Sequence, residues 1–327
     1  MRFVLRRLGF FVITLWAAIT VNFLIPRLMP GNPAVAMMAR YRGHINPQAL
    51  HALEIAFGVN THHSLLGDYF TYLGNIARLR LGASLTFFPD SVVHEVGQAL
   101  PWTLGLSGLT TIFAFVLGTL IGLLAAWRRG GFLDGVFPPI FVITSAFPYF
   151  WFALLCIWLF SIKLGWFPQS GGYDYTTTVG WSWTFARDVV WHSLLPAFTI
   201  LVTSIGIWIL TMRNNTISVL TEDYVRMARA KGLSPSRIMW TYVGRNAILP
   251  NLTGFAMSLG FVVGGAILVE YVFNYPGVGW MFLQSVENQD YALMQGLFLL
   301  ITVAVLLAIL AADGATAILD PRTRDRR

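Results

Sequence analysis

Six long apolar runs, each free of Asp, Glu, Lys and Arg, dominate the hydropathy pattern of the chain. About 20 apolar residues suffice for a helix to cross a bilayer, and every run is long enough. The runs are Leu8–Pro26, Val96–Trp127, Gly135–Ile162, Val189–Met212, Asn246–Val269 and Tyr291–Ala312. This pattern predicts an all-α, polytopic membrane protein with six transmembrane helices.

Composition supports this class: 56% of the 327 residues are hydrophobic and 11% are charged, which excludes an ordinary soluble domain. Arg2, Arg6 and Arg7 before the first run are typical of a secretory signal. No convincing small-x-small cleavage site follows, so we interpret this run as an uncleaved signal anchor. Cys156 is the single cysteine, so an intrachain disulfide is impossible, and it stands within an apolar run.

Lys and Arg are distributed unevenly over the segments that flank the runs. One alternating set, residues 1–7, 128–134, 213–245 and 313–327, holds 15 of the 22, whereas the opposite set holds seven in a longer stretch of chain. Because cytoplasmic loops carry the excess of positive charge, the first set and both termini are expected in the cytoplasm. The net charge of +7 therefore indicates membrane orientation and contact with lipid, and no nucleic-acid partner is expected.

The predicted division of the chain follows from these runs. It consists of an N-terminal helix over 1–28, an extracytoplasmic helical insertion over 29–95, a core of five spans over 96–318 with a cytoplasmic loop at 213–250, and a cytoplasmic tail over 319–327.

Short helices are expected within the insertion between the first two spans. One begins at Asn46-Pro47 and runs toward Phe57, and another begins at Ser64 and runs through Ile76. Ser91 is expected to cap an amphipathic helix that lies at the membrane interface just before Pro101.

The segment Thr221–Pro250 predicts a helix–turn–helix in the largest basic loop. Thr221 is the expected N-cap, followed by two acids that suit the positive end of a helix dipole. Gly232 is expected to end the first helix as its C′ residue. Ser234 then caps a second helix, with Pro235 at its first position.

Part of this loop resembles the EAA loop of permease subunits from ATP-binding-cassette (ABC) importers. The residues that carry the resemblance are Tyr224, Val225, Arg226, Met227, Ala228, Arg229, Ala230, Lys231, Gly232 and Leu233. Ala228 and Gly232 match the general motif, whereas Arg226 stands at its glutamate. In that family the loop forms a coupling helix that sits in a groove of the ATPase subunit. Because Ala228 and Gly232 are four residues apart, both are expected on the face of the helix that meets this partner. The alternative is a basic loop that lies on anionic lipid.

The chain resembles more narrowly the B-type permease of the oligopeptide/dipeptide importer family. Arg245–Pro250 is similar to the B-type ending of the loop, although Tyr242 stands where a histidine is usual. Further landmarks follow in the family's order: Gly31-Asn32-Pro33, Gly58-Val59-Asn60, Leu81-Gly82-Ala83-Ser84, Leu100-Pro101-Trp102-Thr103-Leu104, Asp290-Tyr291 and Asp320-Pro321-Arg322. The resemblance thus extends over nearly the whole chain.

The last external loop is similar to a family passage that ends in Pro-Gly-x-Gly. Its candidate residues are Glu270, Phe273, Tyr275, Pro276, Gly277 and Gly279. Pro-Gly predicts a tight re-entrant turn with positive φ at Gly277, and the aromatic side chains are expected to pack at the mouth of a pore as an external gate. An ordinary loop with an aromatic belt is the alternative.

Several chemical motifs are missing from the sequence. There is no G-x-x-x-x-G-K-[ST] phosphate loop, no nucleophile elbow and no metal-binding Cys/His set, and His62-His63 is expected to be a surface pair. We therefore expect no catalytic, cofactor or metal site in this chain, with ATP and Mg²⁺ bound by partner subunits. A secondary transporter is the competing class, but Glu270 and Asp313 stand only at span ends and no paired carboxylates lie within a predicted span.

The resemblance implies a type I ABC importer permease fold in a bacterial inner membrane. It also implies a homologous C-type permease, two ABC ATPase domains and an extracytoplasmic solute-binding protein as partners. Peptides are the implied cargo, and oligosaccharides, glutathione or nickel chelates are the alternatives within the family. Pro148 and Pro196 lie inside predicted spans, where proline favours a kink.

The charge distribution gives a topology prediction. A reporter that is active only in the cytoplasm should work when it is fused after Arg129 or at Arg327, and should be silent when it is inserted near Thr61. The opposite pattern would refute the orientation and the function inferred from it.

Overall fold

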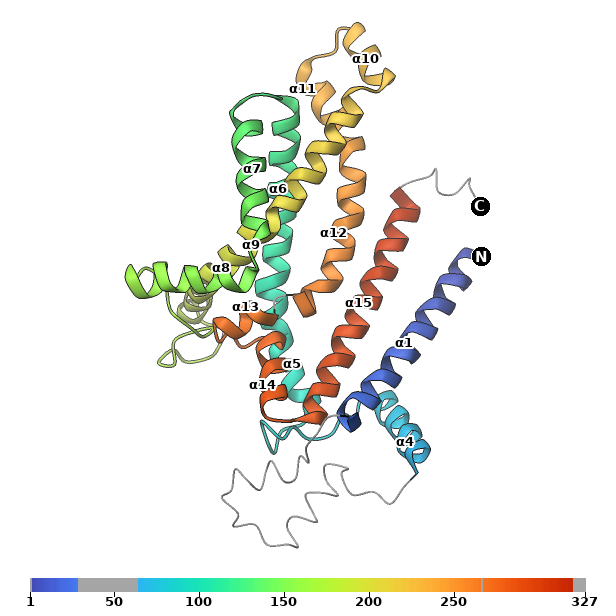
Figure 1. Cartoon of the computed structure of the whole chain (residues 1–327), viewed down its shortest axis with the longest axis vertical. Coiled ribbons are helices and arrows are strands. Elements are labelled where there is room, and N and C mark those ends of the chain that lie inside the picture. The colour runs from blue at the N-terminus through green and yellow to red at the C-terminus, as the bar shows by residue number, and fades with distance from the viewer. Residues whose placement is uncertain (1, 29–63, 266, 320–327) are drawn as a thin grey trace, which may run out of the picture. The chain divides into compact units, whose positions relative to one another are not determined.

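The computed structural model describes residues 2–28, 64–265 and 267–319. The predicted helix toward Phe57, the His62-His63 pair and the landmarks before residue 64 or after residue 319 lie outside these ranges. Helices are the regular elements of the described residues, with one isolated bridge between Ala83 and Ser91, so the all-α prediction is confirmed. Figure 1 shows the helices along the chain.

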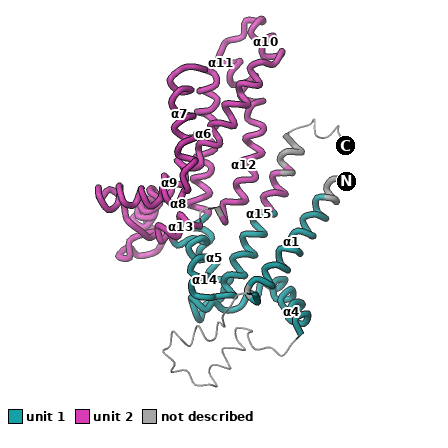
Figure 2. The backbone as a smooth tube through the Cα atoms, viewed as in Figure 1, with its two compact units in different colours: residues 1–103, 276–306 teal, residues 104–275, 307–327 magenta. Residues whose placement is uncertain are grey.

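The chain forms two compact units, each assembled from separate stretches of sequence (Figure 2). Unit 1 comprises Met1–Thr103 and Pro276–Leu306, and unit 2 comprises Leu104–Tyr275 and Leu307–Arg327. The described helices of unit 1 are α1 (Arg2–Leu28), α4 (Leu65–Ala77), α5 (Val92–Thr103), α14 (Val278–Glu287) and the first part of α15 (Tyr291–Leu319). Those lying wholly in unit 2 are η1 (Leu104–Gly108), α6 (Leu109–Trp127), α7 (Phe132–Ala146), α8 (Tyr149–Cys156), η2 (Ile157–Lys163), α9 (Trp183–Leu220), α10 (Asp223–Ala230), α11 (Pro235–Arg237), η3 (Ile238–Gly244), α12 (Arg245–Gly265) and α13 (Ile267–Val272).

Five of the six predicted spans correspond to helical runs that are long and apolar enough to cross a membrane. In the described part of the chain these are Arg7–Ile25, Val92–Trp127, Trp183–Leu220, Pro235–Val272 and Tyr291–Ala312. Helix α9 is 38 residues long, about 57 Å at 1.5 Å per residue, so it extends well beyond a hydrocarbon core of about 30 Å. Pro196 lies inside α9 without ending it.

The third predicted span is broken in the structure. Helix α7 ends at Ala146 and a second helical segment begins at Tyr149, with an angle of 99° between them. The break falls at Phe147-Pro148. Proline removes a backbone hydrogen bond and disfavours the α conformation of the residue before it, and Phe147 is extended (ψ 137°). The kink expected at Pro148 is thus a break between two helical segments, which make a sixth candidate span when the bent pair is counted as one.

The helix expected to begin after Ser91 forms, but it does not end before Pro101. Helix α5 continues through Pro101 into the π-helical segment η1 and then α6, as one helical run from Val92 to Trp127. A proline removes one backbone hydrogen bond from a helix. The wider turn of a π-helix directly after it adjusts the backbone hydrogen bonds without ending the run. Ser91 does cap the start, since its Oγ accepts a hydrogen bond from the His94 N–H at 3.3 Å.

Polar side chains join the helices of unit 1. The Asn22 side-chain amide donates to the Gln295 carbonyl oxygen at 2.8 Å, and the Gln295 amide donates to the Asn22 carbonyl oxygen at 3.1 Å. Such reciprocal bonds hold α1 against α15, because apolar surfaces gain little from each other in lipid. Tyr69 and Tyr72 of α4 pack against Phe23 of α1, at centroid distances of 5.1 and 5.4 Å.

Asp290 organises the start of α15. Its carboxylate accepts hydrogen bonds from the Ser84 hydroxyl, from the Thr86 N–H at 2.8 Å and from the Leu293 N–H at 3.0 Å. Ser84 and Asp290 are both almost fully buried. Two sequence landmarks that are 206 residues apart are thus one buried hydrogen-bonded pair.

Close packing of α6 on α9 forms the centre of unit 2. A Cβ atom placed on Gly118 would lie 2.6 Å from the Trp208 Cβ, and one on Gly122 would lie 2.5 Å from the Ile209 carbonyl oxygen. The two glycines form a small-x-x-x-small pattern that lets two backbones approach closely. The stacked rings of Phe115 and Phe255 (centroids 4.2 Å apart) extend this contact to α12.

The glycine contact predicts a stability difference between two matched variants. Gly122→Val should lower the unfolding free energy of the solubilised protein by about 1–3 kcal/mol, because the added side chain overpacks the α6–α9 contact. Gly135→Val is the control, since a Cβ at Gly135 meets nothing within 4 Å. Thermal unfolding in detergent provides the measurement, and equal midpoints for the two variants would contradict the packing described.

Candidate functional site

The segment predicted to couple to a partner forms the short helix α10 and the turn after it. The helix begins at Asp223 with Glu222 as its N-cap. Thr221 is instead the C-cap of α9, and its hydroxyl donates to the Ser218 carbonyl oxygen at 2.7 Å, so the expectation that Thr221 caps α10 is wrong. The long preceding helix extends to Leu220 and takes Thr221 as its own last residue.

The end of α10 is a Schellman motif, as the predicted glycine terminator requires. Gly232 has a φ of +72°, a conformation that glycine adopts without strain. Its N–H donates to the Arg229 carbonyl oxygen at 2.9 Å, and the Leu233 N–H donates to the Ala228 carbonyl oxygen at 3.3 Å. Ser234 then caps α11, with Pro235 at the first helical position as expected. The turn between the two helices is therefore fixed by hydrogen bonds.

One face of α10 is buried against the ends of three longer helices. Val225 is fully buried and Ala228 is 2% exposed. They belong to an apolar cluster, here called the coupling cluster, whose other buried members are Leu123, Met212, Ile238, Met239, Val243 and Ala247. These side chains come from α6, α9, η3 and α12. Leu233 and Tyr242, the residue in place of the family's usual histidine, pack against the same cluster.

The opposite face of α10 is exposed. Arg226 has 70% of its side chain exposed and forms a 3.5 Å ion pair with Asp223, which contributes little to stability at such exposure. Met227 is 58% exposed. The other exposed residues of the predicted segment are Tyr224, Arg229, Ala230, Lys231 and Gly232. A partner would thus meet a basic surface with one large apolar side chain.

Ala228 lies on the opposite face of α10 from the one expected. Sequence analysis places Ala228 and Gly232 together on a docking face because they are four residues apart. In the structure Ala228 faces the interior of its own subunit, whereas Gly232 is exposed in the turn. The small side chain of Ala228 allows α10 to lie close to η3 and α12. Sequence analysis missed the coupling cluster. The i, i+3 spacing of Val225 and Ala228 could have indicated it, because residues three apart share one face of a helix.

The connection between α6 and α7 lies at the same end of unit 2 as α10 (Figure 1). Leu124 and Trp127 at the end of α6 pack against the coupling cluster. Asp134 near the start of α7 forms a partly buried ion pair with Arg213 of α9 and accepts a hydrogen bond from the Gly130 N–H at 2.9 Å. The basic segments 128–134 and 213–245, both predicted to be cytoplasmic, thus lie at one end of this unit.

The residues of the predicted external gate are divided between the two units. In unit 2, Glu270, Phe273 and Tyr275 are all buried. The Phe273 carbonyl oxygen accepts a hydrogen bond from the Gly171 N–H at 2.8 Å, and the Tyr275 hydroxyl lies 3.0 Å from the Ser193 hydroxyl oxygen. Burial raises the pKa of Tyr275, which keeps its phenol neutral. Both rings are anchored inside the unit, so a gate made of them requires this turn to move.

In unit 1, Pro276, Gly277 and Gly279 lead into α14. Gly277 is the N-cap of α14 with φ −96° and ψ 179°, an extended conformation that any residue adopts. The expectation of positive φ at Gly277 is wrong, because Asn274 (φ 49°) supplies the left-handed residue of this turn. The Val278 N–H donates to the Thr103 hydroxyl oxygen at 2.8 Å, which ties the start of α14 to α5.

Comparison with known proteins identifies the family. Residues 118–325 match the model of the binding-protein-dependent transport system inner membrane component. The chain belongs to this family. It is 35% identical to a di/tripeptide transport system permease protein DppB of Pseudomonas aeruginosa, with 99% of each chain covered. It is also 31% identical to the oligopeptide transport system permease protein AppB of Bacillus subtilis, with 98% of each chain covered.

The residues matched by the family model include α10 and the 270–279 turn, the two candidate functional regions of this membrane transport component. The match begins at Gly118, the first glycine of the α6–α9 contact. Helices α1, α4 and α5 precede the matched residues, although the relatives align over nearly the entire chain.

Two alanines on α10 give a matched test of the buried face in this transport component. Ala228→Leu should lower the unfolding free energy by about 1–3 kcal/mol, because the coupling cluster has no space for the larger side chain. Ala230→Leu, on the exposed face of the same helix, should change it by less than about 0.5 kcal/mol. Thermal unfolding of the purified subunit would compare them, and equal effects would place Ala228 outside the core.

Proposed function

We propose that this chain is the B-type permease subunit of an ATP-driven importer of peptides. The support is twofold: membership of the binding-protein-dependent permease family, and close relatives over the full length that are named as di/tripeptide and oligopeptide permeases. Helical runs of spanning length in the described residues agree with a translocating subunit. Oligosaccharides, glutathione and nickel chelates are weaker candidates, because the relatives compared above are named for peptides.

The observation that carries the mechanism is the attachment of α10 to its own subunit. A helix that receives force from a partner has to be fixed to the elements that it moves. Val225 and Ala228 are buried among side chains of α6, α9 and α12, and well-packed interiors transmit displacement rather than absorb it. A shift of α10 therefore reaches the ends of three spans together.

The exposed face of α10 is the proposed contact with an ABC ATPase domain. The sequence lacks a phosphate-binding loop, so ATP and Mg²⁺ would be bound by two ATPase domains on other chains. Met227 offers an apolar anchor, and Arg226, Arg229 and Lys231 offer charges around it. Charges at the edge of an interface fix the register and speed association more than they add affinity.

The remaining partners and the orientation follow from the same proposal. The basic connections at the α10 end of unit 2 would face the cytoplasm, with both termini of the chain on that side. A homologous C-type permease would complete the translocation path, and a solute-binding protein would deliver peptide at the external side. The 270–279 turn would then lie on the external side, where it remains a candidate gate.

Gly232 gives a test that separates backbone strain from steric conflict with a partner. A Cβ atom at Gly232 meets nothing within 4 Å inside the subunit, so Gly232→Ala and Gly232→Trp share the strain of positive φ, about 1–2 kcal/mol. Only the tryptophan adds bulk on the outer face. In the reconstituted transporter, Gly232→Trp should reduce ATPase binding or peptide-stimulated ATP hydrolysis at least about tenfold relative to Gly232→Ala.

The measurements are co-purification of the ATPase subunits, and ATP hydrolysis and uptake of a labelled dipeptide in vesicles that carry the complete transporter. Equal binding, hydrolysis and uptake by the two variants would mean that the coupling surface lies elsewhere. Uptake of no peptide by the wild-type transporter would refute the proposed cargo.

A further inference from the structure

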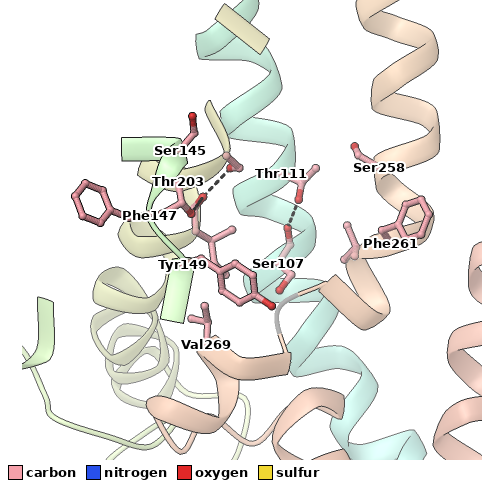
Figure 3. Close-up of a pocket in the computed structure, with 12 residues that line it drawn as sticks. Ser107, Thr111, Ser145, Phe147, Tyr149, Thr203, Ser258, Phe261 and Val269 are labelled. Atoms are coloured by element: carbon pink, nitrogen blue, oxygen red, sulfur yellow. Dashed lines mark hydrogen bonds between the residues drawn. The ribbon is translucent and has the colours of Figure 1, made fainter. Parts of the chain in front are cut away.

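A cavity of about 270 Å³ lies inside unit 2, among η1, α6, α7, α9 and α12. Figure 3 shows its lining side chains. The serines and threonines of this lining are Ser107, Thr111, Ser145, Thr203, Ser204 and Ser258. The aromatic side chains of Phe147, Tyr149 and Phe261 complete much of the wall. None of the described lining residues is charged. We call this cavity the hydroxyl pocket.

The hydroxyl pocket lies halfway along four apolar runs of the sequence. The midpoints of the second, third, fourth and fifth runs fall beside Thr111, Tyr149, Ile200 and Ser258, and all four residues line the pocket. If these runs cross the bilayer, the pocket is near its middle. Polar groups at that depth are costly unless they serve a polar ligand or bind one another.

The hydroxyl groups of the pocket are arranged as hydrogen-bond acceptors. Thr111 donates its proton to the Ser107 carbonyl oxygen at 2.7 Å, and Ser258 donates to the Phe255 carbonyl oxygen at 2.8 Å. Ser145, Thr203 and Ser204 also donate to carbonyl oxygens of their own helices. A hydroxyl has one proton and two lone pairs, so each oxygen still accepts a bond. Such a lining is complementary to N–H donors.

Ser107 differs from the other hydroxyl groups. Its side chain is buried at 3% exposure, and its Oγ has no hydrogen-bond partner among the described residues. It lies in the π-helical segment η1, and π-helical turns are frequent at functional sites. Burial of a hydroxyl without a partner is unfavourable. A bound ligand with a polar group at this position would satisfy it.

The break between α7 and α8 also lies at the hydroxyl pocket. Phe147, in the non-helical link after Ala146, and Tyr149, the first residue of α8, both line the cavity. Non-helical backbone at membrane depth is tolerated where it is buried in protein or lines a polar cavity. The broken helix, the π-helical segment and the unpartnered hydroxyl group thus occur together at one place.

We propose that the hydroxyl pocket binds the backbone amide groups of a peptide during translocation, an inference that rests on the proposed function. The acceptor lining fits the N–H groups that every peptide shares, and the unpartnered hydroxyl of Ser107 lies in the same wall. The absence of charge in the lining lets peptides with different side-chain charges pass. The cavity volume is near the lower limit for ligand pockets, so it suits a short part of a peptide.

Two adjacent threonines provide the test. Thr110 and Thr111 make the same local bond, to the Leu106 and Ser107 carbonyl oxygens at 2.6 and 2.7 Å, but only Thr111 lines the pocket. The probe is labelled trialanine, taken up below saturation by vesicles that contain the complete transporter and its binding protein. Thr111→Val should reduce uptake about three- to tenfold, the effect of one hydrogen bond. Thr110→Val should match the wild type, and Thr111→Ser should restore uptake.

An N-methylated trialanine, chosen to bind the solute-binding protein as well as trialanine does, separates amide recognition from general damage. The wild type should take up the N-methylated peptide more slowly than trialanine. In Thr111→Val the ratio of the two uptake rates should be closer to one. Equal uptake of trialanine by Thr111→Val and Thr110→Val would overturn the pocket and leave the proposed function intact. Failure of the wild type to transport any peptide would refute the proposed function, and the pocket assignment with it.

Thiol labelling tests whether another subunit fills the cavity instead. Ser258→Cys in a Cys156→Ala background places one reactive thiol in the pocket. Trialanine with the binding protein and ATP should protect it from a membrane-permeant maleimide. A thiol that is unreactive in the assembled transporter, with or without trialanine, would show that a partner helix covers the pocket and would overturn the proposal.

Discussion

The burial of Val225 and Ala228 against the ends of α6, α9 and α12 is the contact on which the proposed mechanism depends. Without it, α10 would be a tethered peptide on the surface, and a partner that moved it would move little else. The eight residues of α10 are too few to form a stable helix alone, since isolated helices of this length are marginal in water. Tertiary packing and the Schellman turn therefore maintain the helix, and the same packing joins it to the spans.

The helices that receive this contact approach each other closely. Gly118 and Gly122 bring the backbones of α6 and α9 together, and the aromatic stack of Phe115 and Phe255 includes α12 in the same assembly. Contacts of this kind replace the hydrophobic driving force that is absent between helices in lipid. Unit 2 therefore has a densely packed region on the side of α10 and, further along the same helices, the hydroxyl-lined cavity.

Polar residues within the apolar runs fall into two groups with different environments. Asn22 and Asn251 join helices: the Asn251 side-chain amide donates to the Thr119 hydroxyl oxygen at 3.2 Å and to the Trp208 carbonyl oxygen at 3.3 Å. Apart from Ser107, the serines and threonines of the cavity instead donate to carbonyl oxygens of their own helices, which leaves the lone pairs of each hydroxyl oxygen able to accept a bond. The first group contributes to assembly, whereas the second is available to a ligand.

The class of fold and the turn after α10 follow from the sequence alone. The apolar runs predicted five helical runs of spanning length, because the bilayer sets a minimum length for any helix that crosses it. Gly232, Ser234 and Pro235 marked the turn after α10, because capping is local chemistry. Three-dimensional packing sets the inward orientation of Ala228, the extended backbone of Gly277 and the left-handed backbone of Asn274. The pairing of Ser84 with Asp290, the break at Pro148 and the cavity beside it also required the structure. These features arise from contacts between residues far apart in the chain, and a pattern of neighbouring residues carries no information about which distant surface each one meets.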